Sequence, residues 1–313
     1  MKRILKGMYL VSIIIMFFAL SSCNYTSSNS GTSSSLSGFN GLSMELRVPR
    51  NELLVSSSST SPAEFEIPYS LLIKNMGAYT VPKENAVLQI SGYDPSLLNV
   101  EPSAFLFGEL EGRSTTRPVG DTIVFSNSDS GLTLDDVNSI KNTYEFDLFY
   151  NLCYKYVTSL SSSVKLVPLN TLNLANEIPS QNSVSFSQGQ GAPLAVTRIN
   201  VFLTNNKVLL TIYVEKKSGK LIYYTDNFPP DSCGTIDFSS RNKFKVNEAS
   251  LSDNTAKDCS GKEFYLDENG RGQVTCTFNL GDPITSPITS ILNMDLEYYV
   301  FDSVSQRFSI KRI

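Results

Sequence analysis

The stretch YEFDLFYNLCYKYVT, residues 144–158, indicates the fold class of this chain. Apolar side chains recur at every second position, beginning with Tyr144, Phe146 and Leu148, and Glu145 and Asp147 stand between them. Successive side chains of a β-strand point to opposite faces of a sheet, so a period of two indicates a strand with one buried face. The stretch therefore predicts a half-buried strand rather than a helix.

Similar runs continue on both sides, separated by clusters of Gly, Pro, Asn, Asp and Ser. The other expected strands are 44–48, 65–74, 86–91, 105–111, 122–125, 164–167, 183–186, 194–203, 207–214, 220–224, 243–251, 262–266, 273–280, 295–301 and 306–312. The best helix candidate, 133–141, would make only two turns. The pattern predicts an all-β chain built of antiparallel sandwiches, each with about six to nine strands.

A composition change suggests where one sandwich ends and the next begins. Residues 168–191 are rich in Pro, Asn, Gln, Ser and Gly and hold only one short strand-like piece. With 313 residues, the chain is long enough for two domains that each bury a core. We therefore expect a boundary near Ser180, with the first sandwich at 42–180 and the second at 181–313.

The N-terminus reads as a lipoprotein signal peptide over residues 1–22. Basic residues precede an apolar run, MYLVSIIIMFFAL at 8–20, which is shorter than the roughly twenty residues of a spanning helix. The residues that follow, Leu20–Cys23 (LSSC), resemble a lipobox, which implies that a diacylglyceryl group is attached to Cys23 and that cleavage occurs before it. Ordinary cleavage near Ser21 and Ser22, or an uncleaved signal anchor, remain alternatives.

Residues 23–41 are expected to be a lipid-anchored linker. The segment consists largely of Ser, Thr, Gly and Asn, which bury little apolar surface on ordering. A flexible tract of this length spans on the order of 20–25 Å. That distance would hold a folded domain clear of the lipid headgroups.

Composition also excludes some functions. The chain has no histidine, which removes the commonest general base and transition-metal ligand. Without the three leader residues Lys2, Arg3 and Lys6, 23 of the 26 basic residues remain against 30 acidic ones, a net charge of about −7. No basic block stands out, so we expect no nucleic-acid partner.

Three motifs resemble Ig-like modules of the CARDB-like kind, found in tandem in surface proteins of small-genome archaea and bacteria. They are LLIKNMGAY at 71–79, QGQGAPLAVT at 188–197 and CYKYVT at 153–158. In the first motif the apolar residues would face a core, and Asn75 and Gly77 would make a tight turn. The residues Leu209, Thr211 and Tyr213 resemble the same element in the second domain. The resemblance implies two Ig-like sandwiches and a cell-surface setting.

Four cysteines remain once Cys23 is set aside. Cys259 and Cys276 flank an expected hairpin with its turn at 267–272, and we predict a disulfide between them, although the register requires an asymmetric loop or a bulge. Such a bridge would contribute roughly 3 kcal/mol. Cys153 and Cys233 could form a bridge across domains or remain as free buried thiols. No CxxC pair and no histidine support a zinc site.

The sequence shows no catalytic motif, cofactor loop or metal-ligand set. DENG at 267–270 begins like a calcium loop, but Arg271 and Phe278 occupy positions where that loop needs oxygen ligands, so a hairpin turn fits better. Asp129 and Asp135–Asp136 fit solvated turns better than a cation site. A serine nucleophile has no base in context. We therefore expect no catalytic residue, cofactor or metal.

These observations favour a lipid-anchored, extracytoplasmic protein of the cell envelope that works by binding, adhesion or scaffolding. Its expected partners are the membrane, through the lipid on Cys23, and a protein or another envelope component. A structural spacer in a larger envelope assembly is the alternative. An anchored hydrolase that uses two carboxylates is a further alternative, since any two acids can meet in space.

Overall fold

The computed structural model describes most of the chain beyond the linker. The described residues are 36–55, 67–100, 104–126, 133–134, 140, 142–168, 183–204, 206–228, 233, 236–252 and 254–313. Residues 1–22, predicted to be a signal peptide, and residues 23–35 of the predicted linker, including Cys23, lie outside them, as do Asp129 and Asp135–Asp136. All the described residues belong to one compact unit.

The described chain is nearly all β, as the alternating pattern predicts. Its strands are β1 (Leu42–Arg47), β2 (Glu52–Val55), β3 (Ser70–Asn75), β4 (Ala86–Ser91), β5 (Leu98–Asn99), β6 (Ala104–Leu106), β7 (Thr122–Ser126), β8 (Thr133–Leu134), β9 (Thr143–Leu166), β10 (Ser183–Ser185), β11 (Leu194–Thr204), β12 (Lys207–Lys216), β13 (Leu221–Tyr223), β14 (Lys243–Leu251), β15 (Asn254–Thr255), β16 (Lys262–Tyr265), β17 (Arg271–Asn279) and β18 (Ile288–Arg312). A short 3₁₀ turn, η4 (Phe238–Ser240), precedes β14. The helix candidate at 133–141 begins instead with β8, which pairs with β5.

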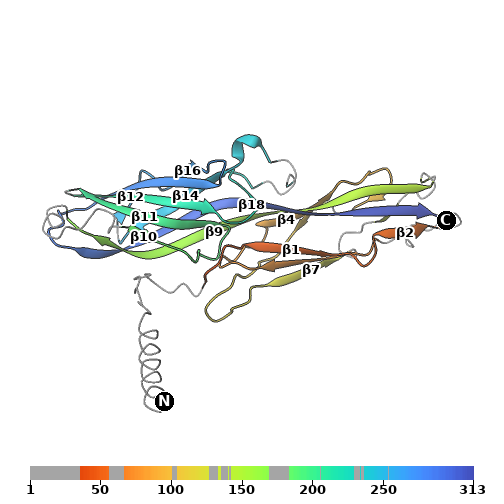
Figure 1. Cartoon of the computed structure of the whole chain (residues 1–313), viewed down its shortest axis with the longest axis horizontal. Coiled ribbons are helices and arrows are strands. Elements are labelled where there is room, and N and C mark those ends of the chain that lie inside the picture. Colours follow the sequence, from red (N-terminus) through yellow and green to blue (C-terminus); the bar gives the residue numbers. More distant parts are fainter. Residues whose placement is uncertain are drawn as a thin grey trace, which may run out of the picture. The chain divides into compact units, whose positions relative to one another are not determined.

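Two unusually long strands, β9 and β18, lie side by side (Figure 1). They pair antiparallel without a break from Leu166 opposite Ile288 to Thr143 opposite Lys311. The sequence predicts two separate strands in each of these regions, because serines dominate 159–163. The structure joins them because Leu160, Ser162 and Val164 keep the alternation and their backbone is paired throughout with β18.

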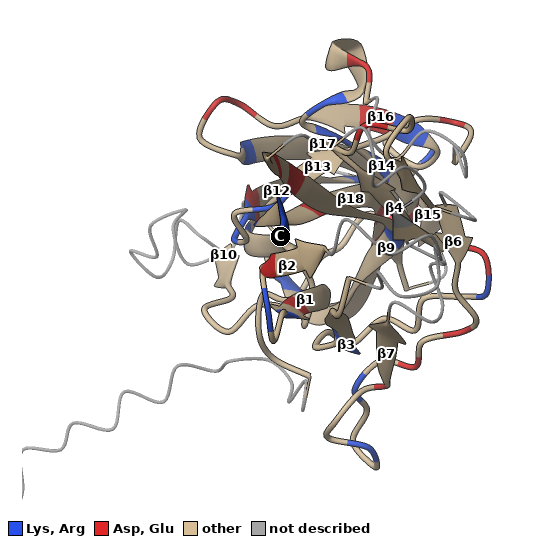
Figure 2. Cartoon of the chain, turned by 90° about the vertical axis from the view of Figure 1, so that its right-hand side faces the viewer, with Lys and Arg blue, Asp and Glu red and all other residues tan. Residues whose placement is uncertain are grey.

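Three sheets form two layers. The nine-stranded sheet has the central order β15-β14-β18-β9-β4-β6, and β2, β13 and β16 pair at its sides. The three-stranded sheet β1-β3-β7 and the four-stranded sheet β10-β11-β12-β17 supply the second layer. In Figure 2, β1, β3 and β7 are set apart as a layer beside β9, β4 and β6.

Both smaller sheets pack against the same face of β9. Its even-numbered residues are buried from Phe146 to Leu166, while most odd-numbered residues are exposed or half-buried. Among these even-numbered residues, Tyr154 contacts β1 through its hydroxyl and Thr158 contacts β11. One long strand thus supplies the core of both sandwich-like halves.

The expected division into two domains at 42–180 and 181–313 is not confirmed. Strands from both sides of the predicted boundary belong to one nine-stranded sheet, and β9 pairs with β18 over its whole length. The boundary residue itself, Ser180, lies outside the described residues. The sandwich pattern predicted from sequence is present, but the halves share their longest strands.

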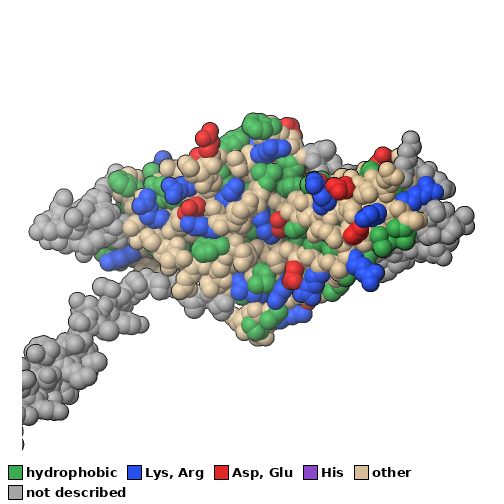
Figure 3. Space-filling view, turned by 45° about the vertical axis from the view of Figure 1, so that its right-hand side comes forward, with side chains coloured by type: hydrophobic (Ala, Val, Ile, Leu, Met, Phe, Trp, Pro, Cys, Tyr) green, Lys and Arg blue, Asp and Glu red, His purple; other side chains and the backbone are tan. Residues whose placement is uncertain are grey.

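Exposed apolar side chains are scattered over the side of the molecule shown in Figure 3. They form separate groups, and basic and acidic residues are interspersed among them. This side therefore shows several small apolar groups rather than one continuous apolar patch.

Candidate functional site

The three motifs that resemble Ig-like modules come together in the structure. We call this region the joint, and its residues are Asn75–Tyr79, Tyr154, Tyr156, Thr158, Gly191–Leu194 and Tyr298. The backbone N–H of Ala78 donates to the carbonyl of Gly191 at 2.8 Å, which links the first motif to the second. Tyr156, from the third motif, donates to the same carbonyl at 3.3 Å.

Asn75 and Gly77 form the expected turn, each for its own reason. The Asn75 side-chain oxygen accepts the N–H of Gly77 at 3.1 Å, and its amide donates to the carbonyls of Tyr79 at 2.8 Å and Leu110 at 3.0 Å. Only glycine fits at position 77, because a Cβ there would overlap the Tyr156 hydroxyl and the carbonyl of Asn40. Gly191 has a left-handed φ of 67°, which favours glycine.

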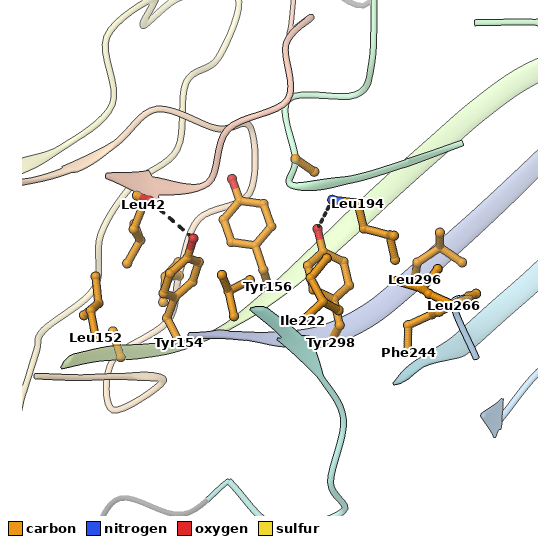
Figure 4. Packing of buried hydrophobic residues seen from close by; sticks show 14 of the residues in the cluster. Leu42, Leu152, Tyr154, Tyr156, Leu194, Ile222, Phe244, Leu266, Leu296 and Tyr298 are labelled. Carbon is orange, nitrogen blue, oxygen red and sulfur yellow. Dashed lines mark hydrogen bonds between the residues drawn. The ribbon is translucent and has the colours of Figure 1, made fainter. Parts of the chain in front are cut away.

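The tyrosine hydroxyls of the joint point the same way, toward β1 and β11 (Figure 4). Tyr154 donates to the carbonyl of Leu42 at 3.3 Å. Thr158 donates to the carbonyl of Leu194 at 2.6 Å and lies 2.9 Å from the Tyr298 hydroxyl, which accepts the N–H of Leu194 at 3.2 Å. Burial raises the pKa of Tyr154, Tyr156 and Tyr298 well above the usual value. These groups stay neutral and hold strands together, so the joint is structural.

The disulfide predicted between Cys259 and Cys276 is present, with the Cα atoms 5.3 Å apart. The expected turn at 267–272 is present, with the N–H of Asp267 donating to the carbonyl of Arg271 at 2.7 Å and an antiparallel bridge between Leu266 and Gly272. Beyond that bridge the expected hairpin does not continue, because β16 pairs with β14 and β17 pairs with β12, so the chain crosses from one sheet to the other. The disulfide therefore joins two layers, which removes the register problem that a hairpin would pose.

Cys153 and Cys233 also form a disulfide, with their Cα atoms 5.6 Å apart. It fastens Cys233 to the face of β9 that points away from the joint. On that face Tyr223, Tyr224 and Tyr299 pack together, and Phe228 stacks on Tyr299 with ring centroids 5.2 Å apart. Burial, and secondarily Glu297, raises the pKa of Tyr299 to about 12.

The described acids do not gather into a metal-binding cluster. Within the described ranges, no three His, Cys, Asp or Glu residues gather as a metal site requires. The Asp267 carboxylate instead accepts the backbone N–H of Asn269 at 2.9 Å and of Arg271 at 2.8 Å, as in a self-contained turn. The carboxyl groups with a shifted pKa, Glu45, Asp94 and Asp237, are shifted downward by hydrogen bonds to close neighbours, Arg47, Ser96 and Ser239 respectively.

The strongest candidate for a binding site is the solvent-facing side of the four-stranded sheet, which we call the outer face. It is aligned in rows across β10, β11, β12 and β17. The rows are Ser185–Arg198–Tyr213–Gln273, Ser183–Asn200–Thr211–Thr275, Phe202–Leu209–Thr277 and Thr204–Lys207–Asn279. Phe202 is 54% exposed and Leu209 is 37% exposed.

A β-bulge in β11 determines which residues reach the outer face. The pairing with β12 shifts between Val196 and Arg198, so buried positions change from Leu194 and Val196 to odd-numbered residues from Ile199 on. The Gln190 side chain stabilises this bulge, because it accepts the N–H of Val196 at 2.9 Å and donates to its carbonyl at 3.2 Å. The bulge thus turns Arg198, Asn200 and Phe202 outward.

The outer face carries an excess of positive charge. Arg198, Lys207 and Arg271 lie on it with one acid, Glu215, which is 3.7 Å from Arg271 and 2.6 Å from Lys217. Arg198 and Lys207 have no ion pair among the described residues. The guanidinium of Arg198 lies 4.2 Å from the ring centroid of Tyr213, whose hydroxyl accepts from Asn200 at 3.4 Å.

The outer face was not identified from the sequence, because Leu209, Thr211 and Tyr213 stood out there only for their resemblance to the first motif. These three residues point outward, and Val208, Leu210, Ile212 and Val214 are buried. The uninterrupted aliphatic set is the signal that indicates the buried side. It buries more apolar surface than the alternate set, so it determines the register.

The predicted lipid-attachment residue, Cys23, lies outside the described residues, as does the apolar run at 8–20. Among the residues that the structure does describe, no helix has the length and hydropathy needed to cross a membrane. Lipid attachment therefore stays a prediction from sequence.

No family model and no curated protein matches the chain. A solved structure with some similarity is the secreted serine protease VesC from Vibrio cholerae, at 10% identity and a TM-score of 0.17. The match covers 85% of this chain and 51% of that protein, so the chain spans about half the length of its match. Similarity at this level carries no argument about fold or activity.

Proposed function

We propose that this protein is a lipid-anchored extracytoplasmic protein that binds or scaffolds at the cell surface through an Ig-like β-sandwich body. The observation that carries the proposal is the pair of buried disulfides, Cys153–Cys233 and Cys259–Cys276. Disulfides form and persist in oxidising compartments outside the cytoplasm. Together with the signal-peptide pattern and the lipobox-like Leu20–Cys23, they support export followed by anchoring.

A binding role is supported by the outer face, which presents an exposed aromatic ring, unpaired bases and many hydroxyl and amide groups on a rigid sheet. The β9–β18 pairing supports the second candidate, a spacer within an envelope assembly, because continuous pairing holds the two halves as one stiff body. Cross-linking from position 209 on intact cells distinguishes them. A binder captures its partner there, whereas a spacer captures only at residues remote from the outer face.

Catalysis is not part of the proposal. General acid catalysis at neutral pH needs a carboxyl group whose pKa is raised, and the shifts resolved for Glu45, Asp94 and Asp237 are downward. These acids also lie on separate surface turns and strands. An active carboxylate pair would show itself as loss of a hydrolytic activity on conversion of one acid to its amide.

The anchoring part of the proposal is tested by Cys23→Ser. The variant is expected to move from the membrane fraction to the soluble extracytoplasmic fraction, and it should no longer incorporate labelled fatty acid. Ser22→Ala is the matched control, because it keeps a small residue before the cysteine and should leave the protein anchored. Unchanged membrane retention of Cys23→Ser would refute lipid attachment.

A further inference from the structure

We propose that the outer face binds an acidic polysaccharide, with uronate-type carboxylates on Arg198 and Lys207 and a sugar ring on Phe202. The inference rests on the proposed surface location, and it names the class of ligand for the same site. Three observations carry it. They are the positive charge of the outer face, the hydroxyl and amide residues on its rows, and the fixed position of the Arg198 guanidinium.

The charge of the outer face is opposite to that of the whole chain. The chain has a net charge of −4, but the outer face has three bases and one acid, Glu215, which is already engaged by Lys217 and Arg271. A second acid, Asp258, lies at the β17 edge, where it accepts the N–H of Thr277 at 2.9 Å. A polyanion is therefore attracted to this sheet and repelled by the remainder of the surface. Some bases elsewhere are neutralised by acids, as Lys243 is by Glu263 and Lys155 by Glu297.

The uncharged residues on the outer face suit a sugar chain. Hydroxyls and amides make up the row Ser183–Asn200–Thr211–Thr275, and they both donate and accept hydrogen bonds, as sugar hydroxyls do. Adjacent rows are about 7 Å apart along each strand, so the sheet presents a flat, regular grid to an extended ligand. Phe202 offers an exposed ring edge and face for stacking at one end of the grid.

Arg198 is held in place before any ligand arrives. Its guanidinium rests on the ring of Tyr213 at 4.2 Å, and Asn200 donates to the Tyr213 hydroxyl. A fixed guanidinium loses little freedom when it binds a carboxylate through two hydrogen bonds. The β-bulge at 196–198 places this arginine outward, so the arrangement is built into the strand.

The same observations disfavour other partners. Nucleic-acid binding rests on many phosphate contacts, and the outer face offers only two bases without an ion pair among the described residues, Arg198 and Lys207. A stable protein interface needs a continuous apolar centre, and the outer face offers only Phe202 and Leu209 as exposed apolar side chains. A polysaccharide that carries several hydroxyls beside each carboxylate fits the charge and the polarity together.

The test uses the full chain in detergent, with polygalacturonate as the acidic glycan and dextran as the neutral one. We expect polygalacturonate to bind and dextran not to bind, with binding weakened by added salt. Arg198→Gln/Lys207→Gln and Phe202→Ala should each lower the affinity about tenfold, as expected for the loss of charge-assisted contacts or of an aromatic anchor. The matched controls are Lys165→Gln/Lys262→Gln, which removes the same charge elsewhere, and Phe238→Ala, which removes a ring that is 83% exposed on another surface.

The proposal is overturned if polygalacturonate does not bind, or if the control variants lose as much affinity as the outer-face variants. Equally tight binding of polyphosphate or a single-stranded oligonucleotide would also overturn it. So would a change of oligomeric state in the outer-face variants. The last result would make the sheet a self-association surface. None of these depends on lipid attachment, so failure here is separate from failure of the Cys23→Ser test. Circular dichroism on each variant verifies that the fold is intact.

Discussion

In the joint, the hydroxyls of Tyr154, Tyr156 and Tyr298 are buried and bonded to backbone groups of other strands. On the outer face, the same residue types, tyrosine, threonine and asparagine, are half-buried or exposed on the solvent side of the sheet. The two regions differ in what their polar groups contact: those of the joint bond to the backbone of other segments, whereas Asn200 and Tyr213 of the outer face bond to each other beside the solvent. Sequence motifs pointed to the joint, whereas the strands of the outer face show only the ordinary alternation of polar and apolar residues.

Each region has its own disulfide. Removing the two disulfides should give the largest difference between the regions in the free energy of unfolding. Cys153–Cys233 closes a segment of 80 residues behind the joint, and Cys259–Cys276 closes one of 17 beneath the outer face. Chain entropy predicts that replacing each pair with alanine lowers the free energy of unfolding by about 4.5 and about 3 kcal/mol, respectively. Urea unfolding measures both, and the reverse order would contradict this reading.

Gly77→Ala should be the most damaging single substitution in the joint. The added Cβ would overlap the Tyr156 hydroxyl and the Asn40 carbonyl, and the latter is backbone that cannot turn aside. We expect a loss of more than about 3 kcal/mol, at the upper end for overpacking. Gly219→Ala is the control, because a Cβ there meets nothing within 4 Å. Equal stability of the two variants would show that the joint is loosely packed.

Alkaline pH should destabilise the protein through the joint. Burial raises the folded-state pKa of Tyr154, Tyr156 and Tyr298, so their contribution is complete below about 10, the unfolded value, and is lost as pH rises beyond it. At pH about 10 the loss is roughly 1 kcal/mol for the three together. Urea midpoints and tyrosinate absorbance should change together, and tyrosinate forming in these residues before unfolding would contradict the prediction.

Substitutions on the outer face should have the smallest effect on stability. Arg198→Gln/Lys207→Gln and Phe202→Ala remove side chains that are exposed and make few internal contacts. We expect the free energy of unfolding to stay within about 1 kcal/mol of the unsubstituted protein, since the largest loss is one cation–π contact. A larger loss, measured by urea unfolding, would mean that the outer face is structural too.

Sequence reasoning performed best where an alternating run is bounded by turn residues. It placed β4 and β14 at their observed limits, 86–91 and 243–251. It divided β9 and β18, because serine-rich and mixed stretches have weak strand preference and only the pairing between the two strands keeps them extended. That pairing joins residues far apart in the chain, and no local pattern reveals it.

The candidate site was harder to predict than the fold. In β12 both alternate sets contain apolar residues, and only the uninterrupted aliphatic character of one set indicates which is buried. The bulge in β11 reverses the alternation in mid-strand, and it depends on Gln190 reaching back to Val196. The Cys259–Cys276 bridge was predicted correctly although the arms on either side of the predicted turn pair in different sheets, because both arrangements bring the two cysteines within reach.

The attachment of Gly38 to the body of the protein determines how the molecule responds to a pulling force. Gly38 is fastened at the joint, where its N–H donates to Gln188 at 2.7 Å and its carbonyl accepts from Gly191 at 2.9 Å, beside the middle of β9. Just before Gly38, the carbonyl of Ser37 accepts from Arg113 at 2.7 Å, so a pull on the N-terminus loads this hydrogen bond and the two of Gly38 within a few residues. A pull on the C-terminus of β18 loads its pairing with β9 along the whole strand, in shear. A pulling force on the N-terminus should therefore detach the segment around Gly38 at a lower force than is needed to separate β18 from β9.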